Sequence, residues 1–174
     1  STRNYLGKDA WHQNQNYFQG GMDEVRVWSV ARSQDEIRAT MNRQLQGSEA
    51  DLVGLWNFDD GTATDVSPNG NEGVLMGGAT TVESNLAAPS NTVQTATGQP
   101  RSPLGTGGVL ELNGEGSYVE LPATAFAHLT DVTVEGWVRW DIFHQCSRLI
   151  DLALDGVLIN IQCRGGQWGD VLWA

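Results

Sequence analysis

Met22-Asp23-Glu24-Val25-Arg26-Val27-Trp28 is the stretch that decides the fold class. Val25 and Val27 alternate with Glu24 and Arg26, which is the pattern of a β-strand with one buried face. The same alternation places Asp23 on the face of the two valines. A carboxylate on a buried face requires a partner, so Asp23 is the first residue to consider for a metal or an ion pair.

A short helix is predicted directly after this strand. Ser33 and Glu36 have the spacing of a capping box, with Ser33 at the N-cap and Glu36 at the third helical position. Ile37, Met41 and Leu45 follow at intervals of four residues, which gives one apolar stripe. The sequence therefore predicts one short amphipathic helix near residues 33–45.

Short strand patterns occur on both sides of this helix, and two of the turns between them have the composition of two-residue hairpins. Asn113-Gly114 and Asp155-Gly156 are the hairpin signals. The strand patterns are residues 5–6, 52–58, 74–76, 109–112, 117–121, 132–140, 148–154 and 157–163. Many short strands with one helix predict an all-β fold, an antiparallel two-sheet β-sandwich of the jelly-roll kind.

Residues 79–108 differ in composition from the rest of the chain. Thr, Ser, Ala and Gly dominate, and Pro89, Pro100 and Pro103 interrupt the stretch, so no periodicity survives. We predict a linker here, which could reach about 100 Å if fully extended. It divides the chain into a segment of residues 1–78 and a segment of residues 109–174.

The charge of the chain limits its partners. Ten basic residues stand against 21 acidic residues, and the formal net charge is −11. Such a surface repels the phosphates of nucleic acid and disfavours adsorption to anionic membranes. No window approaches the length of apolar sequence that a membrane-spanning helix requires. We therefore expect neither nucleic acid as a partner nor a membrane span.

The motifs together resemble the laminin-G-like domains of the concanavalin-A-like lectin/glucanase superfamily. The stretches that resemble the closing strand and helix of such a domain are residues 17–28 and 31–37, and those that resemble its opening are residues 110–114, 118–121 and 134–138. Residues 52–61 with 65–71 are similar to a stretch common around these domains. The resemblance implies a sandwich and a binding role at the cell surface or outside the cell.

The order of these motifs departs from the family, because the closing motif comes first. The resemblance implies that residues 1–78 are the closing part of one sandwich and residues 109–174 the opening part of a second, in a tandem array. We expect these segments to need strands that the chain lacks before they fold as closed sandwiches. The alternatives are that subunits complete each other head to tail and form a filament, or that the two segments pack on each other within one chain, which the length of the linker allows.

Calcium is the one cofactor that the sequence suggests, in a structural role. Laminarinase-like relatives carry a similar closing strand whose aspartate holds calcium, and Asp23 is the matching position. Asp65, Ser67 and Asn69 place side-chain oxygens at alternate positions before a glycine, as in the first half of a calcium loop. The candidate metal ligands are Asp23, Asp65 and Asn69. The alternatives are a capping or ion-paired role for Asp23 and an Asx-turn loop for the other two.

Catalysis finds no support in the sequence. His12, His128 and His144 belong to no recognisable nucleophile framework. The paired acids of glucanases on this fold are absent, because Glu135 is followed on its face by Trp137 and Arg139. We therefore expect no enzymatic activity from these residues.

Three further groups of residues leave alternatives open. Cys146 and Cys163 form either a bridge or two thiols, since predicted pairing of Arg148 with Cys163 puts them on a diagonal. Trp11, Trp137 and Trp168 either stack on a sugar or fill the core. Glu24 and Arg26 are most simply a solvated face.

The function predicted from these observations is non-catalytic binding. The chain is expected to be an extracellular or cell-surface adhesion module of a larger protein that recognises a glycan or another protein. One alternative is a structural repeat that assembles into homo-oligomers or filaments. Another is an accessory module of a carbohydrate-active enzyme.

Overall fold

The computed structural model describes residues 3–9, 17–83, 107–142, 147–154, 157–164 and 171–173. The single helix in these ranges is α1 (Gln34–Thr40). The strands are β1 (Asn4–Leu6), β2 (Gln19–Trp28), β3 (Leu52–Trp56), β4 (Val74–Met76), β5 (Thr80–Glu83), β6 (Gly108–Asn113), β7 (Tyr118–Leu121), β8 (Thr133–Ile142), β9 (Arg148–Leu154), β10 (Val157–Arg164) and β11 (Val171–Trp173).

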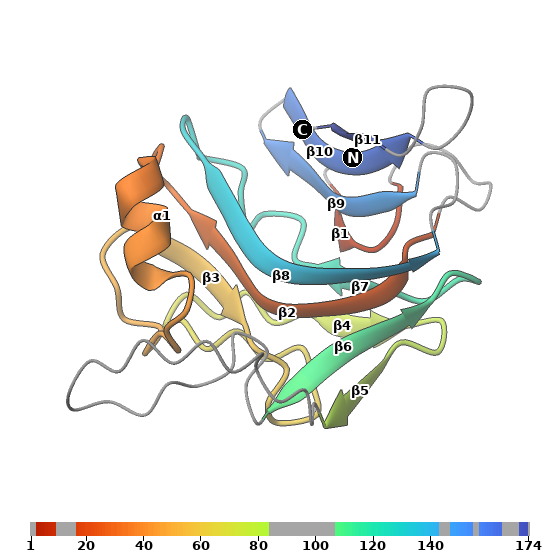
Figure 1. Ribbon diagram of the computed structural model, residues 1–174. Coiled ribbons are helices and arrows are strands. Elements are labelled where there is room, and N and C mark those ends of the chain that lie inside the picture. Colours follow the sequence, from red (N-terminus) through yellow and green to blue (C-terminus); the bar gives the residue numbers. More distant parts are fainter. Residues whose placement is uncertain are drawn as a thin grey trace.

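The strands form two antiparallel sheets (Figure 1). Sheet A has six strands in the order β11-β10-β9-β1-β7-β4. Sheet B has five strands: β2 pairs with β8 on one side and with β3 and β6 on the other, and β5 pairs with β6. The predicted all-β sandwich with one short helix is confirmed.

The strand β2 is the central element of sheet B. Its residues pair with β8 from Gln19 to Trp28, while β6 pairs with its first half and β3 with its second half. Gly20 allows β2 and β8 to approach closely. A Cβ atom at Gly20 would lie 2.0 Å from the carbonyl oxygen of Arg139, and the φ angle of 147° is one that side chains rarely adopt.

Both segments of the chain contribute strands to both sheets. β1 lies between β7 and β9 in sheet A, and β2 lies between β6 and β8 in sheet B. The expectation that the two segments need strands from elsewhere therefore differs from the structure, in which each covers the apolar strands of the other. Their assignment to two successive domains of a tandem array stays a prediction; within this chain they are two parts of one sandwich.

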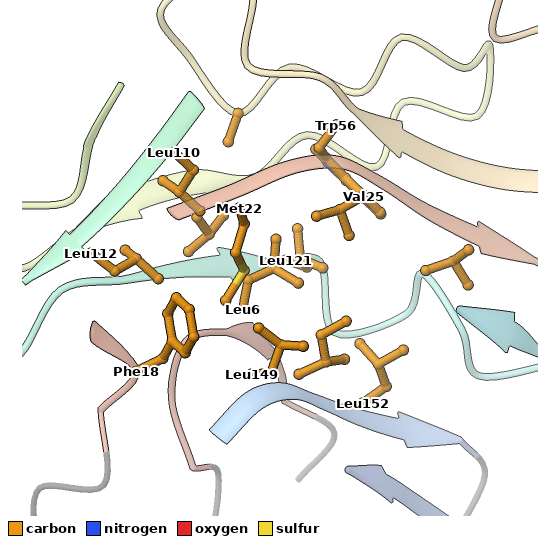
Figure 2. Packing of buried hydrophobic residues seen from close by; sticks show 14 of the residues in the cluster. Leu6, Phe18, Met22, Val25, Trp56, Leu110, Leu112, Leu121, Leu149 and Leu152 are labelled. Carbon is orange, nitrogen blue, oxygen red and sulfur yellow. The ribbon is translucent and has the colours of Figure 1, made fainter. Parts of the chain in front are cut away.

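The core lies between the two sheets and draws on both segments (Figure 2). Leu6 and Phe18 from the first segment lie close to Leu149 and Leu152 from the second. The fully buried members include Met22, Val25, Trp56, Leu110, Leu112, Val119, Leu121 and Phe126. Burial of apolar surface stabilises by roughly 25 cal/mol per Å² only where a second layer covers it, so neither segment alone owns this core.

The predicted hairpin at Asn113-Gly114 is wrong. β6, before the turn, belongs to sheet B and pairs with β2 and β5, whereas β7, after it, belongs to sheet A and pairs with β1 and β4. Gly114 and Gly116 both have positive φ, and the chain uses them to cross from one sheet to the other. The crossing lets β6 and β7 face each other across the core.

The predicted hairpin of β9 and β10 is confirmed, with Leu154 opposite Val157. A register shift after Ile161 places Arg148 opposite Gln162, so the predicted pairing of Arg148 with Cys163 is wrong. Cys163 instead pairs with Leu172 in β11. Cys146, His12, His144, Trp11 and Trp168 lie outside the described residues, so the prediction of a bridge stays open.

The predicted linker overlaps one strand. β5 begins at Thr80 and pairs with β6, so regular structure continues past residue 79. Residues 84–106 lie outside the described residues. Across the ranges that the structure describes, no helix is long and apolar enough to cross a membrane.

The helix α1 begins as predicted. The hydroxyl of Ser33 accepts a hydrogen bond from the backbone N–H of Glu36, and the Glu36 carboxylate accepts one from the backbone N–H of Ser33. The helix ends at Thr40 rather than near Leu45. Leu45 still packs inward, against Trp28, Leu52 and Leu55 in a small second cluster.

Candidate binding pocket under helix α1

A cavity of about 240 Å³ lies between α1 and the face of sheet B that points away from the core. Figure 1 shows α1 beside the ends of β2 and β8 that form its floor. Its lining is supplied by three elements: Glu24 and Arg26 from β2, Ile37 and Met41 from α1 and the residue after it, and Val134, Glu135, Gly136 and Trp137 from β8.

An irregularity in β2 shapes the floor of this cavity. The pairing of β2 with β8 shifts between Asp23 and Arg26, and Glu24 has a positive φ of 51°. Such a bulge adds one residue to the strand and re-aims its side chains. Met22 and Val25, three residues apart, consequently both enter the core. The sequence prediction uses simple alternation to place Asp23 on the face of Val25 and Val27. Because of the bulge, alternation does not assign the face of Asp23.

Arg26 holds the end of α1 against the sheet. Its side chain is 2% exposed. One guanidinium nitrogen donates to the carbonyl oxygen of Thr40 at 3.1 Å, and the other donates to the carbonyl oxygen of Arg43 at 2.6 Å. Carbonyls at the end of a helix lack helical partners, and a cation satisfies them while it opposes the helix dipole. Arg26 therefore binds the C-terminal end of the short helix to the sheet.

Two acidic and two basic side chains balance each other at the cavity. Arg26 pairs with Glu24 at 2.7 Å and lies 3.7 Å from Glu135. Arg32 also pairs with Glu135, and its guanidinium lies 4.0 Å from the centre of the Trp28 ring. Burial raises the pKa of Glu24, and the hydrogen bond from Arg26 opposes that rise. The cavity is thus polar with no excess charge from these four groups.

Trp137 forms part of the wall on the β8 side. Its indole nitrogen donates to the carbonyl oxygen of Met41 at 3.0 Å, which fixes the plane of the ring. Ile37 and Met41 supply the apolar remainder of the wall. A fixed aromatic ring beside apolar and charged groups is the composition of a small-molecule site.

Two buried polar atoms at the cavity have unused hydrogen-bonding capacity. Within the described residues, the Nε of Arg26 and the Oε2 of Glu135 make no hydrogen bond. Arg26 Nε is a donor and Glu135 Oε2 is an acceptor, and leaving such atoms unpaired costs free energy. Both atoms are inaccessible to solvent, so they belong to the packed side of these residues and not to the open surface of the cavity.

The prediction that Glu24 and Arg26 form a solvated face is wrong. Both residues lie on the outer face of sheet B, but α1 covers that face. Alternation distinguishes the two faces of a strand and says nothing about a helix that packs on the second face. The sequence does contain one relevant signal. A short helix is predicted soon after Arg26, and the carbonyls at the end of a helix need hydrogen-bond donors.

Asp23 lies in an acidic surrounding beside this cavity. It is 3% exposed, and its carboxylate accepts a hydrogen bond from the backbone N–H of Glu24 at 2.7 Å. Burial raises the pKa of Asp23 to about 7, and the charges of Glu24 and Asp59 add to the effect. A buried carboxylate of this kind fits a cation as one ligand. Glu24 and Asp59 are already engaged, by Arg26 and by Gly108 and Gln44.

Asp65 and Asn69 organise the loop that follows β3. The carboxylate of Asp65 accepts hydrogen bonds from the backbone N–H groups of Leu55, Ser67 and Asn71, and from the Ser67 hydroxyl. The Asn69 amide donates to the carbonyls of Leu52 and Val53. These bonds occupy the groups that a metal would need and favour the Asx-turn role. None of the described bonds of Asp65 and Asn69 reaches Asp23.

Calcium binding by Asp23, Asp65 and Asn69 stays a prediction. The three residues come from two elements: Asp23 belongs to β2, and the other two belong to the loop after β3. Asp23 alone retains the burial and the neighbouring negative charge that a calcium ion would offset.

The comparisons with known proteins give one match. Residues 1–38 match a laminin-G family model described as the concanavalin A-like lectin/glucanases superfamily. The matched stretch contains β1, β2 and the start of α1, so the resemblance of the closing motif is confirmed, and it supports a carbohydrate- or protein-binding module. Neither the curated proteins nor the solved structures give a match to the chain.

Proposed function

We propose that this chain is a non-catalytic, extracellular binding module, and that the cavity under α1 binds one ring of a neutral glycan. The observation that carries the proposal is a cavity in which the fixed Trp137 indole stands beside the polar side chains of Arg26 and Glu135. Sugar hydroxyls satisfy donors and acceptors together, and the apolar face of a sugar packs on an indole.

The size and charge of the cavity narrow the ligand. A volume of about 240 Å³ is below the roughly 300–1,000 Å³ of sites for drug-sized molecules, so one sugar ring is a suitable occupant. Glu24 and Glu135 balance Arg26 and Arg32, and the chain as a whole carries −11. Neutral sugars are therefore favoured over sulfated or sialylated ones.

The proposal of binding without catalysis rests on how the two acids are held. Hydrolysis of a glycoside needs one protonated carboxyl group and one free carboxylate that can reach the reacting carbon. Glu135 is shared between Arg26 and Arg32, and Glu24 is paired with Arg26. Both carboxylates are thus committed as partners of arginines. The filament alternative gains less support, because the two segments already pair with each other.

Titration calorimetry with a panel of methyl glycosides tests this function. We expect a neutral glycoside to bind, and sulfated glycans not to bind. Ile37→Phe fills the cavity without touching the arginines, and it should abolish the heat of binding while the melting temperature stays close to that of the parent. Val66→Phe, at an exposed site outside the cavity, is the matched control. Binding that survives Ile37→Phe would place the glycan elsewhere.

A further inference from the structure

At one side of the sandwich, an apolar residue on the inner face of sheet B is partly exposed to solvent. In sheet B, Met22 is 1% exposed, and its partner in the next strand, Val138, is 37% exposed. Cross-strand partners share a face of the sheet, so Val138 also points toward the inner layer. The inward row of β8 continues only to Trp140, because the register shifts there and Ile142 pairs with Gln19, which alternates with the inward-facing Gly20.

In sheet A, the burial of inward-facing residues also decreases toward the edge, from β9 to β10. Ile150 and Leu152 of β9 are fully buried in the core. Their partners in β10, Ile161 and Ile159, are only partly buried, although they pack against the same core. Sheet A continues to β10 and β11, whereas sheet B ends at β8 within the described residues. The inner face of β10 therefore extends past the last strand that could cover it.

The edge of β8 is long and unpaired on this side. β8 has ten residues and pairs with β2 over its whole length, and none of the other described strands pairs with it. An unpaired edge presents a row of backbone donors and acceptors to any extended chain. We define this open side, made of the β8 edge with Val138, Ile159 and Ile161, as the β8 slot.

We propose that the β8 slot accepts one extended strand from another polypeptide, which adds to sheet B beside β8. The incoming segment would be apolar at alternate positions, so that its inward residues cover Ile159 and Ile161 and pack beside Val138. Main-chain hydrogen bonds supply affinity in this mode of recognition, and alternate side chains supply specificity. Basic residues at its ends would suit the net charge of −11.

A second copy of this sandwich fits the slot less well than a single strand. Edge-to-edge pairing of two β8 strands would bring the partner's own sheet A into the layer into which β10 and β11 already extend. A single strand occupies only the layer of sheet B, and it leaves β10 and β11 in place as its cover.

Fluorescence anisotropy with a labelled peptide tests the proposal. The probe alternates valine and threonine and carries two lysines at each end, and its control replaces two central valines by proline. We expect the probe to bind and the proline peptide not to bind, because proline removes ladder hydrogen bonds. Hydrogen exchange should show added protection in β8 on binding. This comparison leaves the protein unchanged, so it does not depend on how a variant folds.

A matched pair of variants locates the site. Val138→Lys should weaken binding by about tenfold or more, since the lysine brings a charge to the apolar inner edge of the slot. Val74→Lys makes the same change on the edge strand β4 of sheet A, where Val74 is 57% exposed, and it should leave binding unchanged. Equal binding of the two peptides, or loss of binding in both variants, would overturn the proposal. So would a dimer without peptide that Val138→Lys dissociates.

Discussion

The indole nitrogen of Trp137 donates to the carbonyl oxygen of Met41, the residue that caps the end of α1. This bond joins a strand of the second segment to the helix of the first across 96 residues of sequence. It also fixes one wall of the cavity under α1. The position of the helix and the shape of the cavity thus depend on the same contact.

Trp137→Phe should loosen α1 while it leaves the fold intact. The variant leaves the Met41 carbonyl without this donor, and a lost hydrogen bond of this kind lowers the free energy of unfolding by about 1–3 kcal/mol. Urea unfolding measures the change, and hydrogen exchange should show faster opening of residues 34–41. Unchanged exchange in the helix would show that Arg26 alone holds it.

Glu135→Gln should be among the most destabilising exchanges in the part of the chain that the structure describes. It removes the partner of Arg32 and one neighbour of Arg26, and Glu135 is 9% exposed. Breaking a buried ion pair from one side costs about 3–5 kcal/mol. Glu111→Gln is the control, because it breaks the pair with the more exposed Arg139 and should cost at most about 1 kcal/mol. Similar losses in both variants would contradict the buried network.

The stability of the protein should fall as the pH rises from 4 to 8, in part through Asp23. The pKa of Asp23 is about 7 in the folded protein, against an ordinary value of 3.8 for aspartate, so between these values the folded state holds a proton that the unfolded state has released. Asp23→Asn removes this titration. The variant should be more stable than the parent at pH 8 and should show a flatter dependence in this range, as denaturant unfolding at several pH values would measure.

Calcium reverses the expected effect of the same variant. If calcium binds Asp23, it stabilises the ionised carboxylate, at the 2.3–2.6 Å typical of calcium–oxygen bonds. The parent should then gain melting temperature with added calcium, and Asp23→Asn should not. The same response of both proteins to calcium would assign Asp23 a role without metal.

Asp65→Ala should destabilise the protein to the same extent with and without calcium. The carboxylate of Asp65 satisfies three backbone N–H groups, and their loss should cost about 2–5 kcal/mol in total. Thermal unfolding in calcium and in a chelator measures both values. A loss confined to the calcium sample would restore the metal interpretation of this loop.

The chain should hydrolyse no β-glucan. Assays of reducing ends with laminarin and with aryl glycosides should give no turnover above the buffer. Turnover that copurifies with the parent and disappears in Glu24→Gln or Glu135→Gln would show that the two acids act on substrate in spite of their arginine partners.

The parts of the fold that depend on local sequence could be predicted. The capping box of Ser33 and Glu36 and the pairing of Leu154 with Val157 each involve residues that are close in the chain, and both are confirmed. The turn after Asn113 could not be predicted, because the sequence of β6 and β7 suits a hairpin equally well. Their choice of opposite sheets is made by partners far away, β2 and β1.

The site could be predicted only in part for a related reason. The sequence marks Trp137 as a residue that either stacks on a sugar or fills the core, and it shows no acidic partner on the face of Glu135. Arg26 was assigned to solvent, because a strand pattern does not show that a helix will cover the second face. The bulge between Asp23 and Arg26 also has no signature in the residues themselves. It becomes visible only in the pairing with β8, more than a hundred residues later.

The place of β1 has a consequence for the order in which the protein folds. A ribosome releases β1 well before either of its partners, since it lies in the middle of sheet A and pairs with residues 119–121 and 150–151. Neither partner strand is available to β1 until more than a hundred further residues have been synthesised. Pairings of such separation are slow, because the loop between the partners must close before any contact is gained. Sheet A is therefore completed late in synthesis, and Leu6 and the residues that cover it remain in contact with solvent or with a chaperone until then.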